Sequence, residues 1–143
     1  MTVRQSFVLH AVLLGAATSI AFGAVLGSLM FNILVRVALG SGAPFSEAYA
    51  AVPTTAGYSA FAVCLAIAAN FGAGYVSAML SGRKRYLHAV AAGSLVLVYS
   101  ALLYLTPVSE VKLDALSFIL SFLVPIPAVL LGAHYQSRGE AGG

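Results

Sequence analysis

Charged residues are scarce in this chain of 143 residues: they make up 8% of it, where soluble domains carry roughly a quarter. Only four Asp or Glu and seven Lys or Arg residues are present, too few to cover the surface of a water-soluble globule. Hydrophobic residues reach 61%. This composition excludes a soluble globular domain, a disordered chain and a nucleic-acid-binding protein. It predicts an integral membrane protein whose first partner is the lipid bilayer.

Cysteine is almost absent, and groups suited to catalysis do not gather in the sequence. The single cysteine, Cys64, lies in an apolar run and cannot form an intramolecular disulfide, and no Cys/His spacing typical of a metal site occurs. Ser46 and Glu47 have no histidine on their predicted side of the membrane, which a Ser/His/acid site requires. We therefore expect no catalytic residues and no cofactor, and the sequence indicates a non-enzymatic protein.

Four long stretches of the chain carry no charge, and each is long enough for one membrane span but not for two. A span needs about 20 apolar residues, because each helical residue rises about 1.5 Å across a hydrocarbon core about 30 Å thick. The sequence therefore predicts an all-α integral membrane protein, with four antiparallel transmembrane helices in one bundle and a single domain over residues 1–143. The expected helices cover about 7–36, 56–80, 87–106 and 115–135.

The ends of these helices follow from local signals. A cleaved signal peptide is an alternative for the first span, but mostly apolar sequence continues from Ala24 to Val35, which favours a helix over a cleavage site. Pro53-Thr54-Thr55 precedes the second span as a breaker, and Asp114 is a plausible N-cap for the fourth. Pro125 and Pro127 remove two backbone donors and predict a kink.

The basic residues predict the orientation of the bundle. With a cytoplasmic N-terminus, five bases lie inside and two, Arg36 and Lys112, lie outside, as the positive-inside rule requires. The inner bases are Arg4, Arg83, Lys84, Arg85 and Arg138. We expect both termini to be cytoplasmic, with Arg83, Lys84 and Arg85 as a cytoplasmic interface in contact with anionic lipid or a partner.

The first connection, residues 40–55, is longer than the others. Pro44 or Ser46 is suited to open a short helix in the outer interface, with Phe45, Tyr49 and Val52 towards lipid. An ordered connector without a helix is the favoured interpretation. Asn32 and Arg36, one turn apart, either face an outer vestibule or, as we favour, place Arg36 among the outer headgroups.

Small residues recur every four positions in the first two helices and predict close helix packing. Such residues let two backbones approach where lipid provides no hydrophobic drive for association. The two ridges either pack on each other or form the seam of a homo-oligomer. The glycines among them are Gly15, Gly23, Gly27 and Gly74.

A polar group is expected at nearly the same depth in each of the four helices. Because lipid cannot satisfy a carboxamide, Asn70 should point inwards and bond a neighbouring helix. This midplane polar cluster is either structural or a site or constriction for a solute. Its members are Ser19, Asn70, Tyr99, Ser100 and Ser121.

Three histidines, His10, His88 and His134, come from different helices, and all are expected near the cytoplasmic ends. Imidazoles that converge from separate helices are able to bind a metal or haem. Without acidic residues beside them, an interfacial belt of polar and aromatic side chains is the favoured interpretation. They are weak metal candidates, and we expect no metal.

Residues 72–93 read GAGYVSAMLSGRKRYLHAVAAG. This segment resembles the GGYVAARxAGRRxxLHAxxxG hairpin of small bacterial four-helix integral membrane proteins of unknown function. Ala73 replaces the second glycine of the pair, and Ser77 and Met79 also depart from the pattern. The resemblance implies a bacterial inner-membrane setting and a hairpin between the second and third helices, and it implies no activity.

The sequence therefore predicts an accessory, scaffold or immunity-type membrane protein that acts through helix–helix contacts, as a homo-oligomer or in a larger membrane complex. The alternative is an oligomeric small-solute channel or transporter subunit with a polar midplane. A haem- or metal-binding electron-transfer bundle is a third class.

Overall fold

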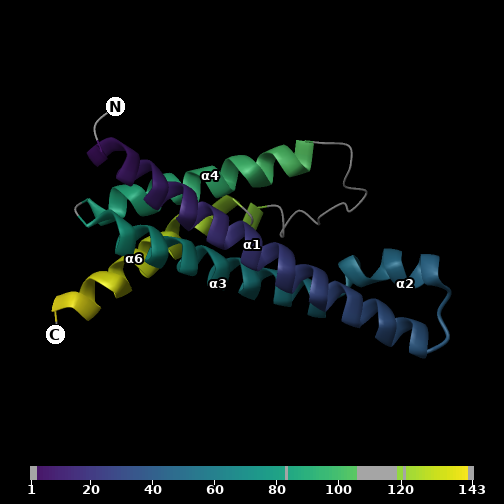
Figure 1. The fold of residues 1–143 in the computed structure, drawn as a ribbon. Helices are drawn as coiled ribbons and strands as arrows, with labels where there is room; N and C mark the ends of the chain where they lie inside the picture. Colours follow the sequence, from purple (N-terminus) through teal and green to yellow (C-terminus); the bar gives the residue numbers. More distant parts are fainter. Residues whose placement is uncertain (1–2, 83, 106–118, 121, 142–143) are drawn as a thin grey trace.

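The structure is a computed structural model that describes residues 3–82, 84–105, 119–120 and 122–141. Every regular element in these residues is a helix. Predictions that concern Arg83, Lys112, Asp114 and Ser121 lie outside the described residues. The elements follow in chain order as α1 (Val3–Gly40), α2 (Phe45–Ala51), the 3-10 helix η1 (Val52–Thr54), α3 (Ala56–Ser81), α4 (Arg85–Leu105) and α6 (Pro125–Ala141), drawn in Figure 1.

Three of the described helices are long and apolar enough to cross a membrane. They cover Leu9–Gly40, Ala56–Ser81 and Arg85–Leu103. The prediction of apolar helices of spanning length is thereby confirmed for the first three predicted spans. The beginning of the fourth predicted span, residues 115–118, lies outside the described residues.

Helix α1 is longer than its predicted span. It has 38 residues and is therefore about 57 Å long at the helical rise, well beyond a hydrocarbon core of about 30 Å. A helix of this length must tilt or project from the bilayer. Its last turns therefore provide a scaffold against which the following segment folds.

Helix α3 begins where the breaker predicted it, at Ala56. The Thr55 hydroxyl accepts a hydrogen bond of 3.3 Å from the Tyr58 amide, which satisfies one of the free donors of the first turn. Helix α3 ends at Ser81, and Gly82 follows with φ +62°, a left-handed conformation that costs glycine little. The chain can therefore reverse at once into α4.

The two prolines near the C-terminus mark an interruption in the helical chain. Val124 is a bend between the helical residue Leu123 and α6, which begins at Pro125. Helical hydrogen bonds still join Val124 to Leu120 and Ala128 to Val124. Since the first residues of a helix have no acceptor for their N–H groups, proline is tolerated there.

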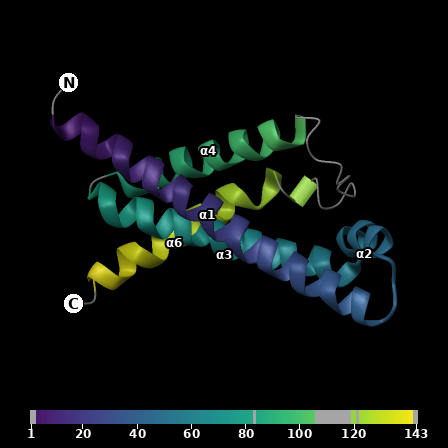
Figure 2. The same cartoon turned by 45° about the vertical axis from the view of Figure 1, so that its right-hand side comes forward.

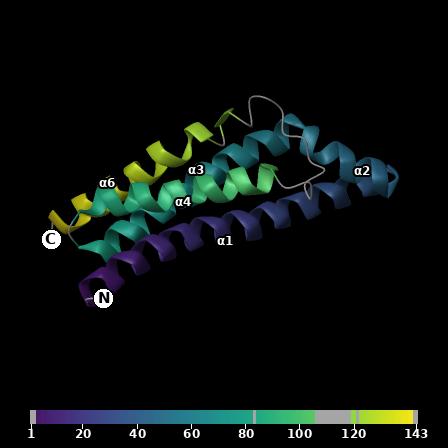
Figure 3. The same cartoon turned by 90° about the horizontal axis from the view of Figure 1, so that it is seen from above.

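Helix α3 is the central element of the fold. It contacts α1, α4 and α6, whereas no contact joins α1 to α6 within the described helices. The start of α1, the connection between α3 and α4, and the end of α6 lie at one end of the molecule, which we call the turn end (Figures 1 and 2). Helix α2 lies at the opposite end, the α2 end, against the last turns of α1 (Figure 3).

The core near the turn end is built from very small side chains. It comprises Ala73, Ala78, Ala89, Val129 and Ala133. Alanines at helix contacts let the backbones approach, which strengthens van der Waals packing between spans. All buried residues of α3 lie between Ala69 and Ala78. The half of α3 towards the α2 end is therefore less covered.

A second, smaller core lies at the α2 end and corrects the prediction of a connector without a helix. Val35 of α1, Ala48 of α2 and Val52 of η1 are buried together. A seven-residue helix is marginal on its own, so this burial explains why α2 forms. Phe45 and Tyr49 are exposed, whereas Val52 is only 4% exposed. The expectation that Val52 faces lipid is wrong, because η1 turns back against α1.

Candidate functional site

A buried polar pair joins α1 to α3. The Ser19 hydroxyl donates a hydrogen bond of 3.4 Å to Asn70 Oδ1, and Asn70 Nδ2 donates one of 2.8 Å to the Ala66 carbonyl. Both Ser19 and Asn70 are 4% exposed. Since lipid offers no partner to a carboxamide, this arrangement satisfies Asn70 inside the protein. At 3.4 Å the bond between the helices is long.

Of the other members of the predicted midplane cluster, the two that the structure describes, Tyr99 and Ser100, do not share this bond. Tyr99 of α4 is 39% exposed, and Ser100 beside it is half-buried. Ser121 lies outside the described residues. The structure therefore brings together two of the five residues, one from each of α1 and α3.

Gly15 marks a close approach between three helices. A Cβ built on Gly15 of α1 would lie 2.8 Å from the Ala73 carbonyl oxygen of α3 and 3.3 Å from Ala92 Cβ of α4. Gly27 makes an ordinary contact, 3.7 Å from Leu65 of α3. Gly23 has no atom within 4 Å of such a Cβ, so it is not at a close contact. A four-residue spacing advances by about 40° around a helix at each step. The small residues of α1 at this spacing, from Ala11 to Gly27, therefore cannot all face one partner.

Gly74 packs against α6 and not against α1. A Cβ on Gly74 would overlap the Val129 carbonyl oxygen, and a Cβ on Gly132 of α6 would overlap the Phe71 carbonyl oxygen. The two glycines therefore let the backbones of α3 and α6 approach each other at adjacent levels. The four-residue spacing indicates a close approach, but it does not identify which neighbouring helix is involved.

The three histidines lie in different surroundings. His10 and His134 are exposed, whereas His88 is only 5% exposed. His88 Nδ1 lies 2.9 Å from the Lys84 carbonyl oxygen, and His134 Nδ1 lies 3.1 Å from the Tyr86 hydroxyl. In the part of the chain that the structure describes, no three His, Cys, Asp or Glu side chains form a group that holds a metal ion.

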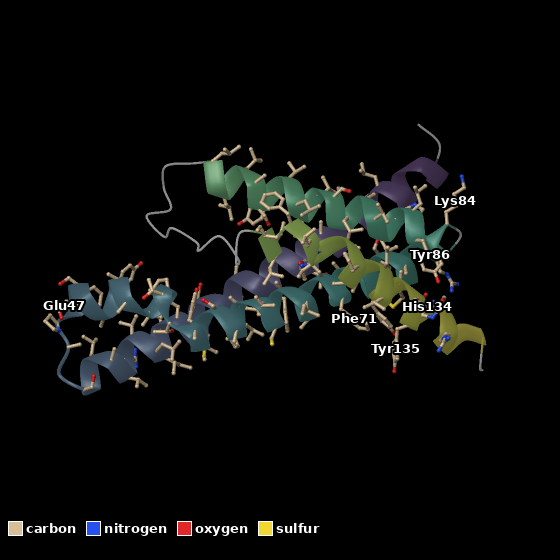
Figure 4. The ribbon with its side chains drawn as sticks, turned by 180° about the vertical axis from the view of Figure 1, so that it is seen from behind. Glu47, Phe71, Lys84, Tyr86, His134 and Tyr135 are labelled. Atoms are coloured by element: carbon tan, nitrogen blue, oxygen red, sulfur yellow. The ribbon has the colours of Figure 1, made fainter. Side chains whose placement is uncertain are left out.

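The turn end gathers basic and aromatic side chains. Lys84, Tyr86, His134 and Tyr135 lie at this end, opposite Glu47 (Figure 4). Arg85 Nε donates a hydrogen bond of 3.0 Å to the Gly82 carbonyl and so fastens the connection between α3 and α4. Of the predicted basic interface, Arg83 lies outside the described residues. The Tyr86–His134 contact ties α4 to α6 at the same level.

An open pocket of about 410 Å³ lies at the α2 end, between α1, the α2–η1 segment and α3. Phe31 packs edge-on against Tyr49 and Tyr58, with ring centroids 4.9 and 6.1 Å apart. We call this hollow the α2-end pocket. Its lining residues are Gly27, Ser28, Phe31, Asn32, Tyr49, Pro53 and Tyr58.

The sequence offered Asn32 and Arg36 together as candidates to face an outer vestibule. Asn32 lines the pocket, whereas Arg36 does not and is exposed beyond it. The aromatic residues come from α1, from α2 within the 40–55 connection, and from α3. Their meeting depends on α2, whose formation the sequence alone did not favour. The available signal was the recurrence of aromatic residues before, within and after that connection.

Comparisons of the chain with protein-family models, with curated proteins and with solved structures find no match. The resemblance of residues 72–93 to small bacterial membrane proteins therefore stays a prediction.

Proposed function

We propose that the chain is a non-enzymatic subunit of a bacterial inner membrane, an accessory, scaffold or immunity-type protein that acts through helix–helix contacts. In this proposal the four uncharged stretches form four antiparallel spans, and α6 is the last half of the fourth. The turn end faces the cytoplasm and the α2 end faces outwards. Three apolar helices of spanning length support the membrane setting.

The distribution of charge supports this orientation. Lys84 and Arg85 begin α4 at the turn end, and Arg138 lies in the last turn of α6. The α2 end carries Arg36 and Glu47. An excess of Lys and Arg on the cytoplasmic side is the strongest determinant of topology in membrane proteins.

An uncovered face of small residues on α1 carries the functional proposal. Ala17, Ala21, Ala24 and Ser28 are all exposed and fall within roughly 60° of one side of the helix. Small residues at this spacing allow another membrane helix to pack closely. Helix α3 covers a different side of α1, where Ala11 and Ser19 are buried. We call this uncovered surface the small face of α1.

The channel and haem alternatives receive less support from the described residues. The Asn70 carboxamide is engaged between α1 and α3 and does not line a lumen. His88 and His134 each contact a different neighbour. The small face is the feature that best fits a protein whose activity consists in binding another membrane helix.

Cysteine cross-linking in native membranes tests the proposal. In a Cys64→Ser background, Ala24→Cys on the small face should cross-link to a second helix, either in another copy of the chain or in a different membrane protein. Leu29→Cys is the matched control, because Leu29 is 55% exposed and lies roughly 100° around the helix from the small face. Equal cross-linking at both positions, or none at Ala24, would refute a specific helix partner.

A further inference from the structure

The α2-end pocket offers hydrogen-bond donors that the protein does not use. Among the described residues, neither the Tyr49 nor the Tyr58 hydroxyl has a hydrogen-bond partner. The Asn32 carboxamide donates one N–H to the Ser28 carbonyl in a hydrogen bond of 2.7 Å, which leaves the other N–H and the carboxamide oxygen free. Asn32 and Tyr49 are exposed and Tyr58 is half-buried, so these groups are open to a ligand that enters the pocket.

The wall of the pocket carries no ionisable acid or base apart from the tyrosines. No Asp, Glu, Lys, Arg or His residue is among its lining residues. A cationic head would lack a carboxylate to pair with, and an anionic head would lack a cation within the lining. The lining therefore favours an uncharged ligand, whose hydrogen-bond acceptors match the free O–H and N–H groups.

The aromatic rings favour a flat ligand. The ring of Phe31 stands at 84° to that of Tyr49 and at 74° to that of Tyr58. The three rings therefore form a corner. A planar ligand ring that stacks on the face of one of them meets the next ring edge-on, and aromatic pairs prefer both of these geometries. The volume of about 410 Å³ lies within the range of small-molecule sites.

In the proposed orientation the pocket lies at the outer end of the bundle, within reach of the bilayer. It lies beside the first turn of α3 and the last third of α1, where apolar spans give way to the short α2–η1 segment. We propose that the α2-end pocket binds the flat, carbonyl-bearing head of an uncharged, membrane-soluble molecule, of which a quinone is the simplest example. This inference does not depend on a helix partner at the small face of α1.

Photo-labelling of the full chain in lipid nanodiscs tests the inference. An azido-quinone with a ten-carbon tail should label peptides that contain residues 27–32 or 49–58, and an excess of the unlabelled decyl quinone should prevent it. Tyr58→Phe and Tyr49→Phe keep the ring and remove one donor each. Each should weaken labelling about five-fold, the effect of one net hydrogen bond.

Tyr99→Phe is the matched control, because Tyr99 is exposed like Tyr49 but lies on α4, outside the pocket. It should leave the labelling unchanged. Labelling spread over the apolar faces without competition would overturn the proposal. Competition by a single-chain phosphocholine but not by the unlabelled quinone would also overturn it, because the aromatic corner would then recognise an ammonium group.

Discussion

Gly74 should be the position least tolerant of a single added methyl group. In Gly74→Ala the new Cβ would overlap the Val129 carbonyl oxygen and lie 2.6 Å from the Val129 carbonyl carbon and Cα. These are backbone atoms of α6, which no side-chain rotation can move away. Since ordinary van der Waals contact begins at 3.4 Å, the two 2.6 Å contacts alone require α3 and α6 to separate by about 0.8 Å, and the overlap with the carbonyl oxygen requires more.

The cost follows from the packing that this separation removes. Overpacking a well-packed core typically costs about 1–3 kcal/mol. Gly74 is at the upper end of that range, because Gly132 closes the same interface against Phe71, and Val129 is also held by Gly93 of α4. We expect Gly74→Ala to lower the free energy of unfolding by about 2–3 kcal/mol, a shift of about 30- to 150-fold in the unfolding equilibrium.

Gly23→Ala is the matched control. A Cβ there meets nothing within 4 Å, and alanine is favoured over glycine in a helix by up to about 1 kcal/mol. Unfolding in mixed micelles of sodium dodecyl sulfate and a mild detergent, followed by circular dichroism, should show Gly74→Ala destabilised and Gly23→Ala unchanged or more stable. Equal stability of the two variants would refute the close approach of α3 to α6.

Other predictions concern single contacts. In the same unfolding assay, Asn70→Leu should lower the free energy of unfolding by about 0.6 kcal/mol and by no more than about 1.7 kcal/mol. Adding Ser19→Ala to Asn70→Leu should lower it no further. A much larger loss of stability would mean a wider polar network. Tyr86→Phe and His134→Ala should be non-additive by about 0.5 kcal/mol in a double-mutant cycle, and strict additivity would exclude a coupling of α4 to α6. Ala48→Leu should detach α2 and speed its amide hydrogen exchange, because Ala48 is only 1% exposed; unchanged protection would contradict the second core.

The sequence was informative where a helix depends on its own composition. The start of α3 at Ala56 follows from a proline breaker and a threonine cap, both local signals. Helix α2 could not be predicted in the same way. Seven residues are too few to be stable alone, and the burial of Ala48 and Val52 that stabilises them depends on a distant residue, Val35.

The same distinction applies to the candidate sites. The spacing of small residues predicted close packing, and Gly15 and Gly74 do lie at close contacts. It could not assign Gly74 to α6, because every side of a helix in lipid is apolar and the pattern contains no information on the neighbour. Depth in the membrane predicted that Asn70 bonds a neighbouring helix, but it could not select Ser19 from the other polar residues at that level. The α2-end pocket could not be predicted because it depends on where α2 lies.

Accessibility of single cysteines in intact cells tests the central claim, a membrane-embedded bundle with its turn end in the cytoplasm. In a Cys64→Ser background, a membrane-impermeant maleimide should label Glu47→Cys on α2 from outside. It should label Arg138→Cys in the last turn of α6 only after the membrane is permeabilised. Labelling of Arg138→Cys in intact cells, or protection of Glu47→Cys until permeabilisation, would contradict the account.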